Sequence, residues 1–115
     1  MMSDENRDLL SKHCFSAADS NALEIGGIRL LLNEVGKHWK LADDHTYIQA
    51  DFSFGNFHET MAFANAVAWI AHREDHHPDM EIGYKHCLVR YTTHAAGGLS
   101  ENDFICASKI DALLF

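Results

Sequence analysis

The fold is decided by residues 46–78, which read TYIQADFSFGNFHETMAFANAVAWIAHREDHHP. In residues 46–54 apolar and polar side chains alternate, and this pattern predicts a strand with one buried face. Gly55-Asn56 breaks the alternation, and the Asn56 side chain can cap a following helix. From residue 57 to about residue 74 the apolar side chains form a broad arc, which is typical of a helix that covers a sheet. Pro78, the only proline, prevents this helix from continuing.

The segments on either side of this stretch complete one domain. Upstream, apolar residues at helical spacing predict a helix over residues 23–35, and residues 38–41 form a short strand. Downstream, two alternating segments predict strands over residues 80–84 and 86–93. Ser100 can cap a final helix over about residues 101–114. This order predicts an α+β domain with a single four-stranded antiparallel sheet and about three helices packed on one face.

The two ends of the chain differ in character. Residues 1–20 are polar and aperiodic, so we expect a flexible N-terminal tail followed by a single domain over residues 21–115. The final helix is apolar on nearly all sides, with Phe104, Ile105 and Ile110 among its residues. A terminal helix of so small a domain is not expected to bury every side internally, which predicts that a partner subunit covers part of it.

Composition restricts the class of protein. The chain has 115 residues, 47% of them hydrophobic, and a net charge of -8. The negative charge disfavours direct binding to nucleic acid or to an anionic membrane surface. No segment approaches the ~20 apolar residues that a membrane helix needs, and the acidic start does not resemble a secretory signal. Three widely spaced cysteines are typical of reduced thiols in a cytoplasmic protein.

Histidines gather around the proline that follows the long helix. His76 and His77 stand between an acidic pair and Pro78, and His94 follows one strand-like segment later. Histidine is the side chain whose two protonation states are both accessible near neutral pH. Several histidines together therefore indicate proton transfer as the chemistry of this region.

The spacing of these residues resembles a known signature. The order His76-His77-Pro78, Tyr84, His94, Asp103 is similar to that of the pterin-4a-carbinolamine dehydratases, a family also known as the dimerisation cofactor of a homeodomain transcription factor. The similarity extends upstream through residues 51–57 and 61–63, so that it covers roughly the last three quarters of the chain. The resemblance implies the fold predicted above, assembled into homodimers or homotetramers.

The resemblance also implies a reaction. Such an enzyme removes water from 4a-hydroxytetrahydrobiopterin, the 4a-carbinolamine, to give quinonoid dihydropterin, which recycles the pterin cofactor of aromatic amino acid hydroxylases. The leaving hydroxyl needs a proton donor and the neighbouring N5 needs a proton acceptor. Histidines can fill both roles, so neither a metal nor a cofactor is expected. The expected partners are the pterin substrate and, functionally, a pterin-dependent hydroxylase.

Position by position, the resemblance implies that His76, His77 and His94 are catalytic, without deciding which donates and which accepts a proton. Further positions match the substrate-binding surface of the family: Asp75, Pro78, Thr93, Ala95, Ala96 and Asp103. The position of Asp103, three residues after Ser100, is equally well explained by a helix-capping role.

Two departures from the family pattern leave alternatives open. His72 stands where the family usually has glutamate, and Ala96 stands where it often has cysteine. His72 and His76 are four residues apart and would share one helical face, so a His-rich metal-binding protein is one alternative. Another is a non-catalytic binding or coactivator module that docks through its apolar last helix.

Overall fold

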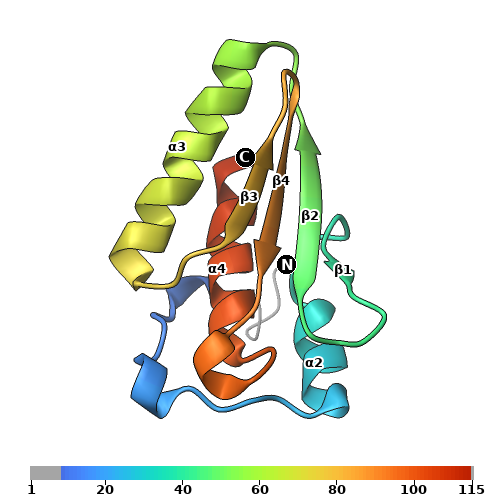
Figure 1. Ribbon diagram of the computed structural model, residues 1–115, viewed down its shortest axis with the longest axis vertical. Coiled ribbons are helices and arrows are strands. Elements are labelled where there is room, and N and C mark those ends of the chain that lie inside the picture. Colours follow the sequence, from blue (N-terminus) through green and yellow to red (C-terminus); the bar gives the residue numbers. More distant parts are fainter. Residues whose placement is uncertain (1–8, 115) are drawn as a thin grey trace.

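The computed structural model describes residues 9–114. The longer elements follow one another in the order α2 (Ile25–Leu32), β1 (Lys40–Leu41), β2 (Ile48–Ser53), α3 (Phe57–Glu74), β3 (Asp79–Ile82), β4 (His86–Tyr91) and α4 (Glu101–Asp111) (Figure 1). Short 3-10 turns complete the chain: η1 (Ala17–Asp19), η2 (His94–Ala96) and η3 (Ala112–Leu114).

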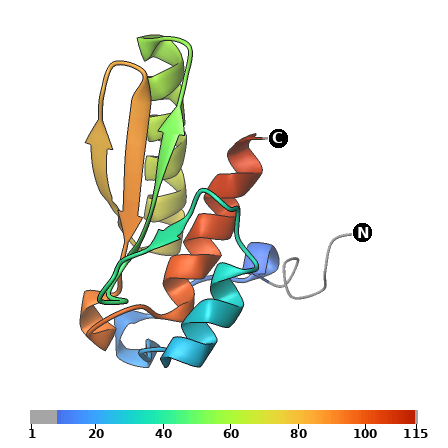
Figure 2. The same cartoon turned by 90° about the vertical axis from the view of Figure 1, so that its right-hand side faces the viewer.

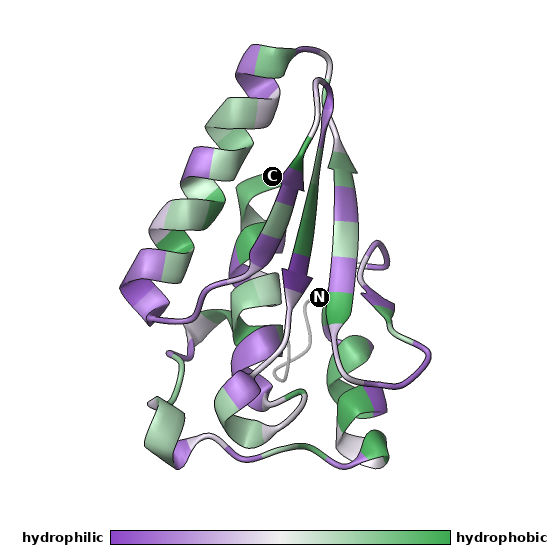
Figure 3. Ribbon diagram, viewed as in Figure 1, coloured by the Kyte–Doolittle hydropathy of each residue, from purple (hydrophilic) through white to green (hydrophobic). Residues whose placement is uncertain are grey.

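The four strands form one antiparallel sheet in the order β1-β2-β4-β3. Alternate residues of the two central strands face the same way, and Ala50 pairs with Val89 in this register. Figure 3 shows the resulting alternation of hydrophobic and hydrophilic residues along β2. The apolar positions of both strands are buried in a core that includes Phe63 of α3 and Phe104 of α4, whereas Asp51 on the opposite face is exposed. The predicted α+β fold, with helices against one face of a four-stranded sheet, is therefore confirmed.

Local signals set the bounds of α3. The Asn56 side chain accepts a hydrogen bond from the backbone N–H of Glu59 at 2.8 Å, as expected of an N-cap. The helix ends at Glu74 because Asp75 adopts a left-handed conformation with φ of 52°. The chain has therefore already left the helix before it reaches Pro78. No helix among the described residues is both long and apolar enough to cross a membrane.

Residues 9–20 differ from the expected flexible tail. Leu9 is 2% exposed and belongs to the hydrophobic core. Residues 13–20, which we call the N-terminal strap, pass beside the end of α3 and the start of α4. The backbone N–H of Cys14 donates to Glu74 at 2.8 Å, and that of Phe15 donates to the side-chain oxygen of Asn102 at 2.8 Å. Residues 1–8, which the same prediction covered, lie outside the described residues.

Helix α4 also differs from expectation, because the chain itself buries almost all of it. Eight of its eleven residues are buried, and they face the sheet, α3, α2 and the strap. Figure 2 shows α4 between the layer formed by the sheet and α3 and, on its other side, α2. The chain itself thus covers most of α4, but Leu113 and Leu114 of the following turn η3 stay 42% and 39% exposed, and a partner subunit at this end remains a prediction.

Candidate active site

A pocket of about 260 Å³ opens where α3 and β4 end and α4 begins. Six residues that the sequence analysis expects near the substrate line it: Asp75, His76, His77, Thr93, His94 and Ala95. The three histidines come from two segments that flank the strand pair β3–β4 and meet at the same end of the sheet. They therefore share one hollow.

His76 is the most enclosed of the three histidines. Its side chain is 12% exposed, and its ring stacks on that of Tyr91 with centroids 5.1 Å apart and planes 19° apart. Burial, and then the neighbouring Cys106 thiol, raise the pKa of Tyr91. The phenol hydroxyl thus remains protonated and donates to the backbone oxygen of His76 at 3.2 Å. Tyr91 therefore holds both the backbone and the ring of His76.

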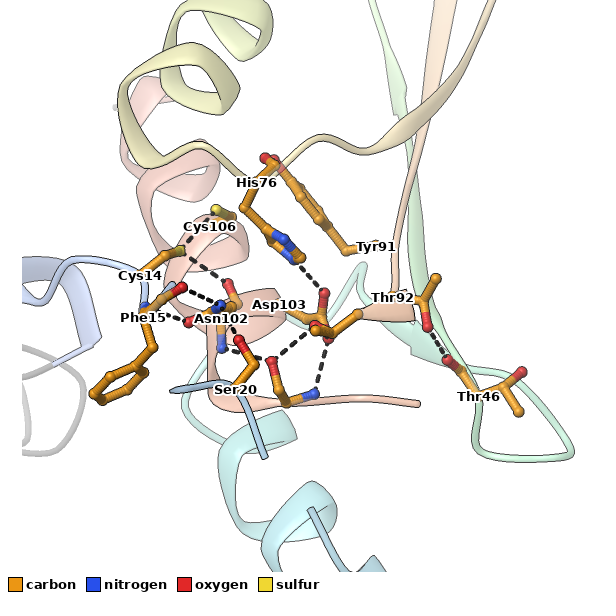
Figure 4. A network of polar contacts seen from close by, with 12 residues as sticks. Cys14, Phe15, Ser20, Thr46, His76, Tyr91, Thr92, Asn102, Asp103 and Cys106 are labelled. Carbon is orange, nitrogen blue, oxygen red and sulfur yellow. Dashed lines mark hydrogen bonds and ion pairs between the residues drawn. The ribbon is translucent and has the colours of Figure 1, made fainter. Parts of the chain in front are cut away.

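Asp103 carries the other restraint on His76. It is fully buried, and its Oδ1 lies 2.6 Å from Nε2 of His76 (Figure 4). Its Oδ2 accepts from the hydroxyl of Thr93 at 2.8 Å and from the backbone N–H of Ser100 at 2.9 Å, which completes a capping box. Since an ionised carboxylate only accepts hydrogen bonds, His76 must carry its proton on Nε2. Asp103 therefore both caps α4 and sets the tautomer of His76.

His77 and His94 are exposed to solvent at the rim of the pocket. His94 begins η2, and Gly97 closes this turn with φ of 77°, a conformation that favours glycine. The turn brings Gly98 back to pair with Thr93. The rim histidines can exchange protons with water, whereas His76 is enclosed and oriented.

The pocket also includes residues that the sequence analysis did not select: Phe15, Ala17, Ser20, Thr92 and Asn102. Three of them belong to the strap, which was assigned to a flexible tail. Asn102 stands in the polar first turn of α4 beside Glu101 and Asp103, so its sequence position carried no signal that another segment packs there. Three expected residues, Pro78, Ala96 and Asp103, do not line the pocket; Asp103 lies behind His76 instead.

The metal-binding alternative loses its geometric basis. The helix ends at Glu74, so His72 and His76 do not lie on one helical face. The His72 ring instead lies against Trp69, with centroids 5.7 Å apart. Within the described residues no group of three His, Cys, Asp or Glu side chains could hold a metal ion. Glu74, the glutamate nearest in sequence to His72 and His76, is hydrogen-bonded to the strap and does not line the pocket.

Comparisons with known proteins identify relatives of the chain in sequence and in fold. A Legionella pneumophila protein named "Putative pterin-4-alpha-carbinolamine dehydratase" is 53% identical over 108 residues, which cover 93% of this chain and 96% of the relative. A Nitrosomonas eutropha protein of the same name is 62% identical over 84 residues, 73% of each chain. The crystal structure of a "transcriptional coactivator/pterin dehydratase" from Brucella melitensis superposes with a TM-score of 0.76 at 28% identity, covering 81% of this chain and 98% of that one. Residues 22–113 match the family model described as pterin 4 alpha carbinolamine dehydratase, and the chain belongs to that family.

Proposed function

We propose that the protein dehydrates 4a-hydroxytetrahydropterins to quinonoid dihydropterins by general acid/base catalysis. The observation that carries this proposal is that His76, His77 and His94 line one pocket, in a chain of the pterin dehydratase family. The pocket of about 260 Å³ is large enough to take a bicyclic pterin while leaving part of it at the open rim.

The reaction needs two proton transfers and no redox step. The C4a–O bond breaks as the hydroxyl leaves with a proton from an acid, and the N5–H proton passes to a base, so that a C4a=N5 double bond forms and one water is released. Each properly placed acid or base contributes on the order of 10²–10⁴-fold. The rim histidines suit proton exchange with solvent, and the oriented His76 suits transfer within the pocket.

The test is a dehydration assay on 4a-hydroxytetrahydropterin followed by ultraviolet absorbance. We expect the protein to accelerate water loss over the buffer reaction, and we expect His76→Ala, His77→Ala and His94→Ala each to lower kcat/KM on the order of 10²-fold or more. His58→Ala is the matched control, because His58 is an exposed histidine of α3 that does not line the pocket. A wild-type rate equal to that of buffer would refute the proposal.

The proposal extends to assembly and to a client pathway. Strand β3 is a sheet edge whose Ile82 is 45% exposed, and such an edge can pair with another copy of the chain. We therefore propose a homodimer or homotetramer built through this edge rather than through α4, and light scattering of the purified protein tests it.

The reaction that supplies the substrate would be that of a pterin-dependent aromatic amino acid hydroxylase, whose product is the 4a-hydroxytetrahydropterin proposed above.

A second candidate function is a protein-binding module. The Brucella melitensis relative carries the words "transcriptional coactivator" in its name, and exposed apolar side chains of this chain, Phe57 and Trp69, lie on α3. A chain that binds a protein partner yet leaves pterin dehydration at the buffer rate would support this function in place of the enzymatic one.

A further inference from the structure

The strap lies outside residues 22–113, the part of the chain that the family model matches. Even so, three of its residues line the histidine pocket. Its turn η1 also packs beside η2, the turn that carries His94. One wall of the pocket is therefore built by a segment that the family signature does not describe.

Asn102 holds this wall in place. It is 3% exposed, and its side-chain oxygen accepts from the backbone N–H of Phe15 at 2.8 Å while its Nδ2 donates to the backbone oxygen of Phe15 at 3.0 Å. Nδ2 also donates to the hydroxyl of Ser20 at 3.2 Å. The amide thus binds Phe15 as a neighbouring strand would, and Figure 4 shows it between Phe15 and Ser20.

Consecutive residues of α4 therefore fix two sides of the pocket. Asn102 binds the strap, and Asp103 binds His76. On the α3 side of the strap, both oxygens of the Glu74 carboxylate bind it, one through the Cys14 N–H and one through His13. The strap is therefore held on both sides of Phe15 in the sequence, at Cys14 before it and at Ser20 after it, so the backbone position of Phe15 is set before any ligand binds.

The Phe15 side chain remains 51% exposed although its backbone is held. A half-exposed aromatic ring on a fixed backbone, at the border of a pocket, is a preorganised apolar surface for a flat ligand. Among the residues that line this pocket, Phe15 is also the sole phenylalanine, tyrosine or tryptophan.

We propose that Phe15 is a substrate-contacting residue whose ring packs on the pterin, and that Asn102 is the positioning residue that holds it there. This inference rests on the proposed function for the identity of the ligand. It assigns to the strap a part of the substrate-binding surface, so that affinity for the pterin depends on a segment that precedes the match to the family model.

The first test compares ligand binding and kinetics in Phe15→Ala, Phe15→Leu and wild type. The probe is 7,8-dihydropterin, which cannot react, titrated by calorimetry. Loss of an aromatic contact weakens binding by about three- to tenfold, so we expect Kd and KM to rise by that factor in Phe15→Ala and by less in Phe15→Leu. The value of kcat should stay within about twofold, because the contact does not take part in proton transfer.

Two further variants make the test specific. Phe57→Ala is the matched control: Phe57 is 49% exposed but does not line the pocket, so its Kd should equal that of wild type. Asn102→Ala should raise Kd about as much as Phe15→Ala does. In the double variant Phe15→Ala/Asn102→Ala the loss of binding free energy should be smaller than the sum of the losses in the two single variants. Urea unfolding of each variant shows that the folded protein is being compared.

The outcomes separate this inference from the proposed function. If wild type binds 7,8-dihydropterin but does not accelerate dehydration, the proposed function fails and the binding comparison still decides the role of Phe15. An unchanged Kd in Phe15→Ala overturns the inference even if the enzyme is active. Full additivity of the two substitutions overturns the positioning role of Asn102.

Discussion

At Asp103 one carboxylate joins the first turn of α4 to the ring of His76. All three of its neighbours, His76, Thr93 and Ser100, must donate to it, since a carboxylate has no proton to give. Its burial leaves no water to replace a lost partner. Asp103 is therefore a positioning residue: the same carboxylate caps the first turn of α4 and sets the tautomer of His76.

The isosteric change Asp103→Asn tests this tie. The amide must turn its NH₂ group towards one of these donors, and if it faces His76 the ring is forced into the other tautomer. We expect kcat to fall by on the order of 10²-fold or more, with a stability loss of about 1–3 kcal/mol. Nitrogen NMR of the His76 ring should report the Nε2–H tautomer in wild type and its loss in the variant.

Asp111→Asn is the control for Asp103→Asn. Its Oδ1 lies 2.7 Å from Nε2 of His38 and accepts from the indole N–H of Trp39 at 2.8 Å, so it has a similar chemical role away from the pocket. The Asp111→Asn variant should be less stable than wild type but should retain its dehydration activity. Equal losses of kcat in the two variants would show that the effect of Asp103→Asn is a general one of disturbed folding.

At the scale of the element, the strap shows how an irregular segment can be well positioned. It contains one short turn, and its position comes from side chains of two helices: Glu74 at the end of α3 and Asn102 at the start of α4. Burial opposes ionisation of Glu74, but hydrogen bonds from the Cys14 N–H and His13, with the nearby Lys109 ammonium, hold its pKa below the usual range.

Glu74→Gln should therefore weaken the attachment of the strap in a pH-dependent way. A carboxyl group whose pKa is lower in the folded state stabilises the fold above its unfolded pKa, about 4.3, and this stabilisation is lost as the pH falls below that value. We expect the variant to be less stable than wild type by about 1–2 kcal/mol at pH 7, and the difference to shrink as the pH is lowered through 4.

Urea unfolding at pH 7 and pH 3.5 measures this difference, and hydrogen exchange of residues 13–20 locates it. Glu81→Gln, at an exposed glutamate of β3, should be neutral at both pH values. A difference between Glu74→Gln and wild type that is the same at both pH values would contradict the assigned role of the carboxylate charge.

For the whole molecule, the sequence predicted the regular elements well because their signals are local. Asn56 and the apolar arc give α3 its start and face, and the alternation in β2 and β4 gives the sheet. The strap and the burial of α4 were missed together, and for one reason. Contacts such as Asn102 with Phe15 join residues far apart in sequence and leave no periodic pattern, so the sequence predicts a flexible tail and a final helix that needs a partner subunit to cover it.

The same buried core predicts how the whole molecule responds to alkaline pH. Burial, and then the charge of Asp51, raise the pKa of Cys87, while the hydrogen bond with Cys106, burial and the charge of Glu74 raise that of Cys14. Groups whose pKa is raised by folding stabilise the native state fully below their unfolded pKa, near 8.5 for thiols, and less as the pH rises above it. Urea unfolding under reducing conditions should show stability falling between pH 8.5 and 10, by up to about 1.4 kcal/mol per pH unit for each thiol. In the variant Cys14→Ala/Cys87→Ala the free energy of unfolding should depend much less on pH over this range. An unchanged pH dependence would show that other groups cause the loss of stability at alkaline pH.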